Sequence, residues 1–353
     1  MDRNPTLRRK TILITGGTGT IGSEIVRQVL AHDPQVVRIF SRDETKQAEL
    51  RLTLPRDAPV RFLVGDVRDP QRLRCALDGV DVVYHAAALK HVPSCEYNPF
   101  EAVQTNVLGT QNVIQAAREA GVRRLTCIST DKAVNPTNTM GATKLLAENL
   151  VRASQDWNPR LNLSVVRFGN VLGSRGSLLP MLARQMEELR EVHVTAPEMT
   201  RFMMTTAEAV QLVLEASRRS RGGELFVLKM PALRTGDLVR VFVEEYCERR
   251  GWPVSSIHWR VIGMRPGEKL HEELLTREEC QRLDEYPDSF VVRPDWLPTP
   301  THSRDTTCGV PASCDSSRCR LADDEQIRQL IEASGVFAQL TVPIGDAMEA
   351  VRS

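Results

Sequence analysis

The chain has 353 residues, 41% of them hydrophobic and 26% charged, which provides enough apolar material for a buried core and excludes the disordered class. Its 46 Lys and Arg against 45 Asp and Glu leave a formal net charge of +1, which argues against nucleic acid or an anionic membrane surface as partner. Eight cysteines in a chain of this length do not make a disulfide framework and favour a reduced, cytoplasmic location.

The charged N-terminus leads directly into a strand, so we expect no signal peptide, and no apolar run approaches the ~20 residues of a membrane span. From residue 11 onward, short β-branched runs alternate with segments of helical period. Strands are predicted over 11–15, 36–40, 60–64, 80–85, 122–129 and 161–168, and helices over 21–32, 70–79, 99–121 and 140–155. This alternation predicts an α/β fold, a Rossmann-like doubly wound parallel sheet.

After about residue 170 the alternation loosens, which predicts a smaller C-terminal α/β lobe. We therefore expect a Rossmann domain over 1–170 and a second lobe over 171–295 that can return strands to the sheet. Residues 296–353 are expected to form a flexible loop and a final helix, since 293–320 are rich in Pro, Ser, Thr and Cys and 323–333 are amphipathic. Three cysteines lie close together in this stretch: Cys308, Cys314 and Cys319. We expect no metal site there, because their spacing contains no C-x-x-C pair and a fourth ligand is missing.

A glycine-rich turn separates the first strand from the first helix. Its G-x-x-G-x-x-G spacing, with a strand before and a second strand about 20 residues on, predicts a dinucleotide pyrophosphate at the helix N-terminus. A plain tight turn is the alternative. We expect the cofactor to contact Gly16, Gly19, Thr20, Ile21 and Gly22.

The second strand ends in Ser41, Arg42 and Asp43. A hydroxyl and a guanidinium at this tip suit a 2′-phosphate and favour NADP, while Asp43 keeps NAD as the lesser alternative. Asp66 and Val67 are placed to meet the adenine. Further cofactor contacts are expected from Ala86, Ala87 and Ala88, whose small side chains let backbone pass close, and from Lys46, Lys90, Asn106 and Lys144.

The segment Ser129-Thr130-Asp131-Lys132 follows the fifth strand, at the carboxyl edge of the sheet where ligands bind. Met140 and Lys144 are spaced i and i+4, so they share one face of the next helix, which we expect to face 129–132. The alternatives are an exposed turn for Asp131-Lys132 and a solvated helix lysine for Lys144.

The sequence resembles the extended short-chain dehydrogenases/reductases, whose Tyr-x-x-x-Lys pair stands here as Met140-x-x-x-Lys144. The resemblance runs from about residue 10 to 295 and narrows to the UDP-N-acetylglucosamine 4,6-dehydratases, nearest to the capsular members that invert C5. The motifs that carry it are AAALKHVPSCE (86–96), STDKAVNPTNTMGATK (129–144), RFGNVLGSRGSLLP (167–180), MTRFMM (199–204) and RPGEKLHEELLT (265–276). Met in place of Tyr occurs in one branch of these dehydratases, so it does not imply a dead enzyme, although it removes the usual phenol base.

The resemblance implies an NADP-dependent lyase that oxidises C4 of the sugar, eliminates water across C5 and C6, and returns the hydride to C6. It implies Asp131 as the acid at the C6 hydroxyl and Lys132 as the base at C5. Thr130 would hydrogen-bond the C4 oxygen. Lys144 would hold the nicotinamide ribose and, since Met140 cannot titrate, help to deprotonate the C4 hydroxyl. Only seven of the 46 basic residues are lysines, and four of them lie in these motifs: Lys90, Lys132, Lys144 and Lys269.

The resemblance also implies the contacts of the substrate, UDP-N-acetylglucosamine. Arginines give bidentate contacts to a diphosphate, and Glu268 would orient Arg265 or bind a ribose hydroxyl. His85 is expected to be a core histidine. A homo-oligomer, a hexamer in the resembling family, is implied as well. The expected substrate-binding residues are Lys90, His91, Asn170, Leu178, Leu179, Pro180, Met181, Leu182, Arg201, Arg265 and Glu268.

Other functions remain open. A nucleotide-sugar 4-epimerase or a 5,6-dehydratase shares the fold and the oxidised C4, but an epimerase has no use for an acid–base pair at C5 and C6. A catalytically silent NADP-binding regulator is supported only by Met140 and opposed by the intact 130–132 segment and Lys144.

Overall fold

The computed structural model describes residues 4–174, 176–294 and 310–340. By its internal contacts the chain divides into two compact units. The first comprises Met1–Gly169, Glu208–Lys229 and Glu273–Asp315, and the second comprises Asn170–Ala207, Met230–Glu272 and Ser316–Ser353. The chain thus leaves the first unit near the expected boundary at residue 170 and later returns to it twice. The limits of separately folding domains stay a prediction.

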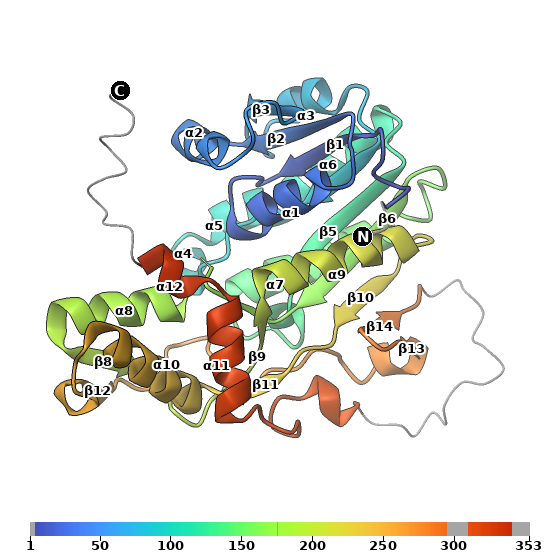
Figure 1. Ribbon diagram of the computed structural model, residues 1–353. Helices are drawn as coiled ribbons and strands as arrows, with labels where there is room; N and C mark the ends of the chain where they lie inside the picture. The colour runs from blue at the N-terminus through green and yellow to red at the C-terminus, as the bar shows by residue number, and fades with distance from the viewer. Residues whose placement is uncertain (1–3, 175, 295–309, 341–353) are drawn as a thin grey trace. The chain divides into compact units, whose positions relative to one another are not determined.

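A nine-stranded sheet organises the first unit (Figure 1). Its strand order is β13-β14-β10-β6-β5-β4-β1-β2-β3, so the chain enters in the middle and builds outward on both sides. The strands from β3 across to β10 are parallel, and β14 and β13 add an antiparallel edge. Their bounds are Thr11–Thr15 (β1), Val36–Ser41 (β2), Val60–Val64 (β3), Val82–His85 (β4), Arg124–Thr130 (β5), Asn162–Phe168 (β6), Leu225–Leu228 (β10), Leu283–Glu285 (β13) and Ser289–Val292 (β14).

The predicted fold class is confirmed: the sheet is mostly parallel and Rossmann-like. The six predicted strands all form, within two residues of their expected ends. Strands such as β1, which is buried along its whole length, are covered on both faces and therefore consist of continuous apolar and β-branched residues. The edge strand β3 is only half buried.

Several helices of the first unit begin at side chains that accept hydrogen bonds from the first free N–H groups. Asp69 accepts from Gln71 and Arg72 at the start of α3, and Asn138 accepts from Gly141 at the start of α7. The predicted helix over 99–121 forms in three parts, α5, a π-helical turn η1 and α6. The helices are Thr20–Leu30 (α1), Glu44–Leu52 (α2), Pro70–Leu77 (α3), Val92–Tyr97 (α4), Pro99–Ala102 (α5), Val103–Leu108 (η1), Gly109–Glu119 (α6), Asp131–Ala133 (η2, 3-10), Thr139–Ala153 (α7), Thr206–Arg219 (α9), Glu279–Arg282 (η4, 3-10) and Ala312–Cys314 (η5, 3-10).

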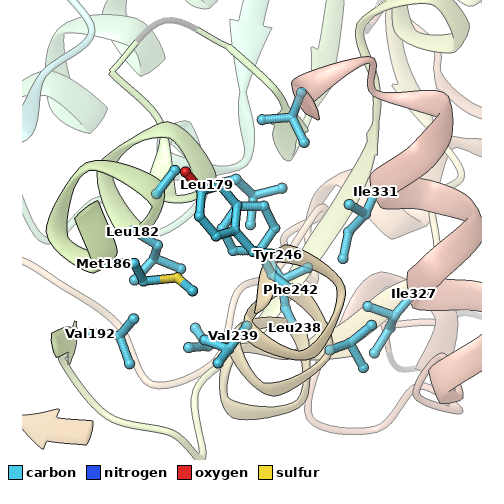
Figure 2. Packing of buried hydrophobic residues seen from close by; sticks show 14 of the residues in the cluster. Leu179, Leu182, Met186, Val192, Leu238, Val239, Phe242, Tyr246, Ile327 and Ile331 are labelled. Carbon is cyan, nitrogen blue, oxygen red and sulfur yellow. The ribbon is translucent and has the colours of Figure 1, made fainter. Parts of the chain in front are cut away.

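The second unit has its own core, which is built from three helices that pack their apolar faces together (Figure 2). Leu179 and Leu182 of α8, Phe242 of α10 and Ile331 of α11 are almost completely buried there. The predicted helix over 323–333 is therefore α11, and its apolar face completes this core. The elements are Asn170–Leu172 (β7), Leu178–Leu189 (α8), Glu191–Val194 (β8), Thr200–Thr205 (β9), Ala232–Arg234 (β11), Thr235–Arg250 (α10), Val254–Ser256 (η3, 3-10), His258–Val261 (β12), Asp324–Ala333 (α11) and Val336–Leu340 (α12).

Two small sheets accompany this core, with strand orders β11-β9-β7 and β12-β8. In the first, β9 pairs antiparallel with β11 and parallel with β7. In the second, β8 and β12 run parallel, and β12 is exposed along its whole length.

Residues 310–320 belong to the segment expected to be a flexible loop, and part of them is buried. Cys314 and Ser316 are 0% exposed. In the first unit the Leu274 N–H donates to the Cys314 carbonyl at 2.8 Å, and in the second the Ser316 N–H donates to the Glu272 carbonyl at 2.9 Å. These backbone hydrogen bonds connect Cys314 and Ser316 to residues 274 and 272. The Pro and Ser content of the segment did not predict such contacts. Cys308 lies outside the described residues, and the described part of the chain contains no cluster of three metal-binding side chains.

Candidate active site

The turn between β1 and α1 has the geometry that a phosphate requires. Gly16 has φ of +65°, and a Cβ there would lie 2.7 Å from the Ala87 nitrogen, so only glycine fits. Gly19 caps α1 without a side-chain hydrogen bond, and the first turn of the helix carries no acidic residue. The helix N-terminus thus keeps its favourable field for an anion. Three further expected contacts form that first turn: Thr20, Ile21 and Gly22.

The tip of β2 carries two ion pairs, Lys46 with Asp43 and Arg42 with Asp66. Asp43 is the N-cap of α2: it accepts from the Lys46 backbone N–H at 3.0 Å and pairs with the Lys46 ammonium at 3.0 Å. Both bonds lower the pKa of Asp43, and the bond from the Lys46 backbone N–H has the larger effect. Arg42 is half exposed and lies 3.6 Å from the carboxylate of Asp66. Asp43 is thus engaged in capping α2, with Arg42 and Lys46 on either side of it in the chain.

Asp66 and Val67 follow β3. The Asp66 carboxylate accepts from Arg68 at its backbone N–H (2.9 Å), Nε (3.0 Å) and Nη2 (2.8 Å). Burial alone would raise the pKa of Asp66, but the Arg68 bonds and the Arg42 charge bring it below its ordinary value. Val67 is buried against the start of α6. The expected adenine contacts stay a prediction.

The loop after β4 is held in place by Asn106. This side chain is 1% exposed, and its amide accepts from the Leu89 N–H at 2.8 Å and donates to the Leu89 carbonyl at 3.0 Å. Its second hydrogen goes to Thr143 on α7 at 3.0 Å. Asn106 lies in the π-helical turn η1, a feature that often marks functional sites. It therefore positions the loop Ala86–Leu89 relative to α7.

His85 is a core histidine, as expected, and is 2% exposed. Its Nε2 lies 3.0 Å from the Thr110 hydroxyl, which itself donates to the Asn106 carbonyl at 2.7 Å. Nε2 is therefore the donor, and Nδ1 accepts from the Thr15 hydroxyl at 2.7 Å. Burial, with Lys144 as a smaller cause, lowers the pKa of His85 to about 3. The neighbouring Lys90 and His91 are exposed.

The end of β5 carries a carboxylate with one oxygen that lacks a protein partner. Asp131 is 0% exposed, and its Oδ1 accepts from the Thr130 hydroxyl at 2.8 Å and from the Lys132 ammonium at 2.9 Å. Its Oδ2 is buried and has no hydrogen-bond partner among the described residues, and the same is true of the Ser129 hydroxyl. A buried polar atom without a partner is costly, so both atoms are suited to a ligand that satisfies them.

Helix α7 approaches this segment at Gly141 and Lys144. A Cβ at Gly141 would overlap the Lys132 carbonyl, so glycine permits the close approach. Lys144 is 7% exposed, and its ammonium donates to the Ile128 carbonyl at 2.6 Å. An ammonium has three N–H donors, so two are left for ribose hydroxyls. Met140 is buried in an apolar cluster with Cys95 and Ala102.

A buried ion cluster that the sequence did not predict lies behind α7. Arg167 of β6 is 0% exposed, and its Nη2 donates to Glu148 at 2.6 Å and to Glu279 at 2.8 Å. Although burial opposes the charge, these two carboxylates raise the pKa of Arg167. Glu148 follows Lys144 by one helical turn, so the i+4 spacing was the available signal. The cluster fixes α7 on the sheet. Ser129 was named within the segment 129–132, but no role was assigned to its hydroxyl.

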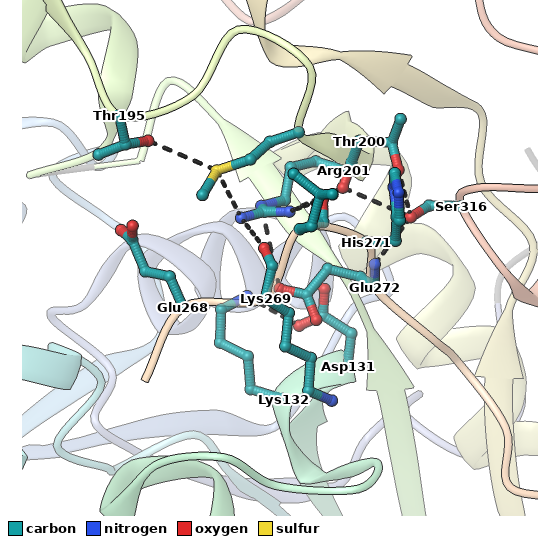
Figure 3. A network of polar contacts seen from close by, with 12 residues as sticks. Asp131, Lys132, Thr195, Thr200, Arg201, Glu268, Lys269, His271, Glu272 and Ser316 are labelled. Carbon is teal, nitrogen blue, oxygen red and sulfur yellow. Dashed lines mark hydrogen bonds and ion pairs between the residues drawn. The ribbon is translucent and has the colours of Figure 1, made fainter. Parts of the chain in front are cut away.

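On the expected substrate side, Arg201 of β9 is turned toward backbone carbonyls of its own unit (Figure 3). Its guanidinium donates to the carbonyls of Lys269 at 2.8 Å and Leu270 at 3.2 Å, and its side chain is only 11% exposed. Arg265 is exposed, and its backbone N–H donates to Glu268 at 2.9 Å. Glu268 therefore contacts Arg265 at its backbone, and the role expected for Glu268 toward the Arg265 side chain or a ribose hydroxyl stays a prediction.

The remaining expected substrate residues also lie in the second unit. Asn170 begins β7, and the segment 178–182 begins α8. Leu179 and Leu182 are 0% exposed and belong to the core, so any contact there with a nucleotide would come from backbone. Met181 is exposed.

Comparisons with known proteins agree with this geometry. Residues 12–294 match a family model described as polysaccharide biosynthesis protein. The chain is 53% identical over 287 residues to an uncharacterized membrane protein of Methanocaldococcus jannaschii, covering 81% of this chain and 86% of the relative. It is 40% identical over 291 residues to a UDP-N-acetylglucosamine 4,6-dehydratase (inverting) of Campylobacter jejuni, and 41% identical over 292 residues to a UDP-glucose 4-epimerase of Rickettsia prowazekii, each covering 81% of this chain and 83% of the relative.

Two solved structures are also similar. Pen from Bacillus thuringiensis superposes with a TM-score of 0.85 at 41% identity, covering 93% of this chain and 98% of that one. A dTDP-glucose 4,6-dehydratase from Streptomyces venezuelae, solved with NAD bound, gives a TM-score of 0.66 at 25% identity, covering 74% and 86%. Although one relative is called a membrane protein, no helix within the described ranges has the length and apolarity to cross a bilayer.

Proposed function

We propose a function from the premise that this chain belongs to the polysaccharide biosynthesis protein family. It is an enzyme of the nucleotide-sugar dehydratase and epimerase group. Within that group, the proposal is a lyase that converts UDP-N-acetylglucosamine to a UDP-2-acetamido-2,6-dideoxy-4-hexulose, with inversion at C5. The product would serve surface polysaccharide or glycoconjugate synthesis.

The observation that carries the proposal is the buried Asp131, whose Oδ2 has no hydrogen-bond partner among the described residues. Elimination of water across C5 and C6 needs an acid and a base over adjacent carbons. Passage of a proton from the Lys132 ammonium to Asp131, 2.9 Å away, would give the carboxylic acid and the free amine that these steps need. Asp131 Oδ2 would then meet the C6 hydroxyl and deliver the proton that makes it leave as water, while the Lys132 amine would remove the C5 proton. A 4-epimerase needs neither step.

Other side chains would hold the reactants. Lys144, held by the Ile128 carbonyl, would donate to the nicotinamide ribose and, as the free amine, take the C4 hydroxyl proton that the usual phenol takes. Thr130 would orient the C4 oxygen, and Met140 would supply apolar volume. The dinucleotide, when bound, supplies the reversible hydride chemistry at C4 and C6. Its pyrophosphate would lie on Gly16, Gly19 and the first turn of α1.

The proposed cofactor is NADP, supported by Arg42 and Lys46 at the tip of β2 and by the capping role of Asp43. NAD, which is bound in the Streptomyces venezuelae dehydratase, is the alternative. Purified protein should release NADP when it is denatured, and chromatography of the supernatant distinguishes the two dinucleotides. Release of NAD alone would overturn this assignment.

The central test combines two variants with UDP-N-acetylglucosamine in D2O. Asp131→Asn keeps the shape but loses the acid, so formation of the dehydrated sugar should fall by at least ~100-fold. Lys132→Met should stop the entry of deuterium at C5. Both variants should bind the dinucleotide as the parent does, which serves as the folding control. If Lys132→Met exchanges deuterium at the native rate, or Asp131→Asn turns over normally, the corresponding role is wrong.

The same incubation separates the other candidate functions. A 4-epimerase would give an isomer of unchanged mass, and a 5,6-dehydratase would lose water but leave an exocyclic alkene, which proton NMR distinguishes from a C6 methyl group. A silent regulator would leave the sugar unchanged.

The proposal includes a homo-oligomer that works in the cytoplasm. Tyr97 and Phe100 are 88% and 83% exposed, which supports self-association, since exposed aromatic side chains of this size are common at interfaces. No disulfide joins the seven cysteines in the described part of the chain, which supports a reducing compartment.

A further inference from the structure

We propose that Ser316 is a positioning residue of the nucleotide-sugar site, which it serves by fixing the segment 269–272 on β9. Ser316 lies beyond residues 12–294, the range of the family match. The inference rests on the proposed function, because it concerns how that site binds its substrate.

Ser316 holds the backbone of Glu272 at two points. Its N–H donates to the Glu272 carbonyl at 2.9 Å, and its hydroxyl accepts from the Glu272 N–H at 2.8 Å. Because Ser316 is 0% exposed, no water can replace these bonds without opening the second unit.

The same hydroxyl connects this segment to β9 (Figure 3). Ser316 Oγ lies 2.7 Å from Thr200 Oγ1, which lies 2.8 Å from Nδ1 of His271. If Thr200 donates to His271, then Ser316 donates to Thr200, and the chain of hydrogen bonds is complete. Ser316 therefore ties two consecutive residues, His271 and Glu272, to one position on β9.

Arg201 bonds the beginning of the same segment, at residues 269 and 270. Its guanidinium donates to the carbonyls of Lys269 and Leu270, and its Nε lies 3.9 Å from the Glu272 carboxylate. Segment 269–272 is thus fixed by Arg201 at one end and by Ser316 at the other. Directly before it lies the turn in which the Arg265 N–H donates to Glu268, both of them expected nucleotide contacts.

Because segment 269–272 is fixed at both ends, we expect Arg265 and Glu268 to have their binding positions before the nucleotide arrives. Misplacement of a binding group by about 1 Å can cost ~100-fold in rate or affinity. Loss of the Ser316 hydroxyl should therefore weaken nucleotide binding. The residues proposed for the cofactor and for proton transfer belong to the first unit, so turnover of bound substrate should change little.

The test compares Ser316→Ala with Ser164→Ala. Ser164 is a matched control because it is 1% exposed and its hydroxyl is bonded to Thr126 at 3.1 Å, in the sheet of the first unit. Ser316→Ala should raise KM for UDP-N-acetylglucosamine at least about tenfold, because both buried hydrogen bonds of the hydroxyl are lost, with kcat within about twofold of the parent. Ser164→Ala should leave KM unchanged while lowering stability by a similar amount. Ser316→Cys, which keeps a weak donor and acceptor, should recover part of the affinity.

A purely structural role for Ser316 predicts equal KM values in both alanine variants, and that result would overturn the inference. If Ser316→Ala does not fold, Thr200→Val removes the other end of the same hydrogen bond and should raise KM in the same direction. Calorimetric titration with UDP alone separates this inference from the proposed reaction. A parent that binds UDP but does not dehydrate the sugar refutes the reaction, while weaker UDP binding by Ser316→Ala still supports the positioning role.

Discussion

At the scale of single residues, Met140 and Lys144 share one face of α7 but lie in different surroundings. Met140 is 4% exposed and packs among apolar side chains that include Cys95 and Ala102. A thioether cannot exchange a proton, so its contribution to the site is volume and polarizability. Lys144 instead points its ammonium at the carboxyl end of β5, where it donates to the Ile128 carbonyl.

These surroundings predict opposite outcomes for two substitutions. Met140→Leu conserves volume and should fold, at a cost below ~1.5 kcal/mol, and keep most of its activity. Lys144→Met removes the ammonium and should lower the single-turnover rate of NADPH formation by at least ~100-fold. Met140→Tyr is not expected to gain activity, since the apolar cluster leaves a phenol no partner. If Met140→Leu folds and binds NADP yet is inactive, the sulfur has a role beyond packing.

At the scale of elements, the sequence predicted best those strands and helices whose burial shows in their own hydrophobic pattern. The strands of the parallel core, such as β1 and β5, are continuous apolar runs because both faces are covered. Helix α2 was not predicted because only Gln47 and Leu50 of its nine residues are buried, which leaves no apolar stripe. The strands β7 and β11 have three residues each, too few to show a period.

In the candidate site, too, local features could be predicted from the sequence and long-range contacts could not. The segment 129–132 and the pair Met140 and Lys144 were predictable together, because strand ends and i,i+4 spacing are local features. Arg167 and Glu279 are 112 positions apart, and Thr200 and Ser316 are 116 apart. No periodicity connects residues at such separations, so these contacts needed the folded chain.

At the scale of the whole molecule, the response of stability to pH should depend on particular buried groups. With 46 Lys and Arg against 45 Asp and Glu, the folded chain has little net charge near neutral pH, so general repulsion contributes little. His85 is the strongest candidate, because it joins Thr15 of β1 to Thr110 of α6 as a neutral ring in the middle of the sheet.

The sign of the His85 effect follows from its two pKa values. In the unfolded chain the imidazole has its ordinary pKa of 6.5, whereas burial lowers the folded value to about 3. Above pH 6.5 both states are neutral and the full stability is present. As pH falls below 6.5 the unfolded chain gains a proton that the folded chain does not, so the free energy of unfolding decreases, by about 2 kcal/mol at pH 5.

Denaturant unfolding of the parent and of His85→Gln at pH 8 and pH 5 isolates this term, since every other titrating group is common to both proteins. The advantage of the parent over the variant should shrink by about 2 kcal/mol on going from pH 8 to pH 5. Parallel pH profiles would mean that His85 takes up a proton in the folded state, contrary to its burial among Thr15, Thr110 and Lys144. If His85→Gln does not fold, NMR titration of the His85 ring in the folded parent provides the same test, because that ring should stay neutral at pH 5.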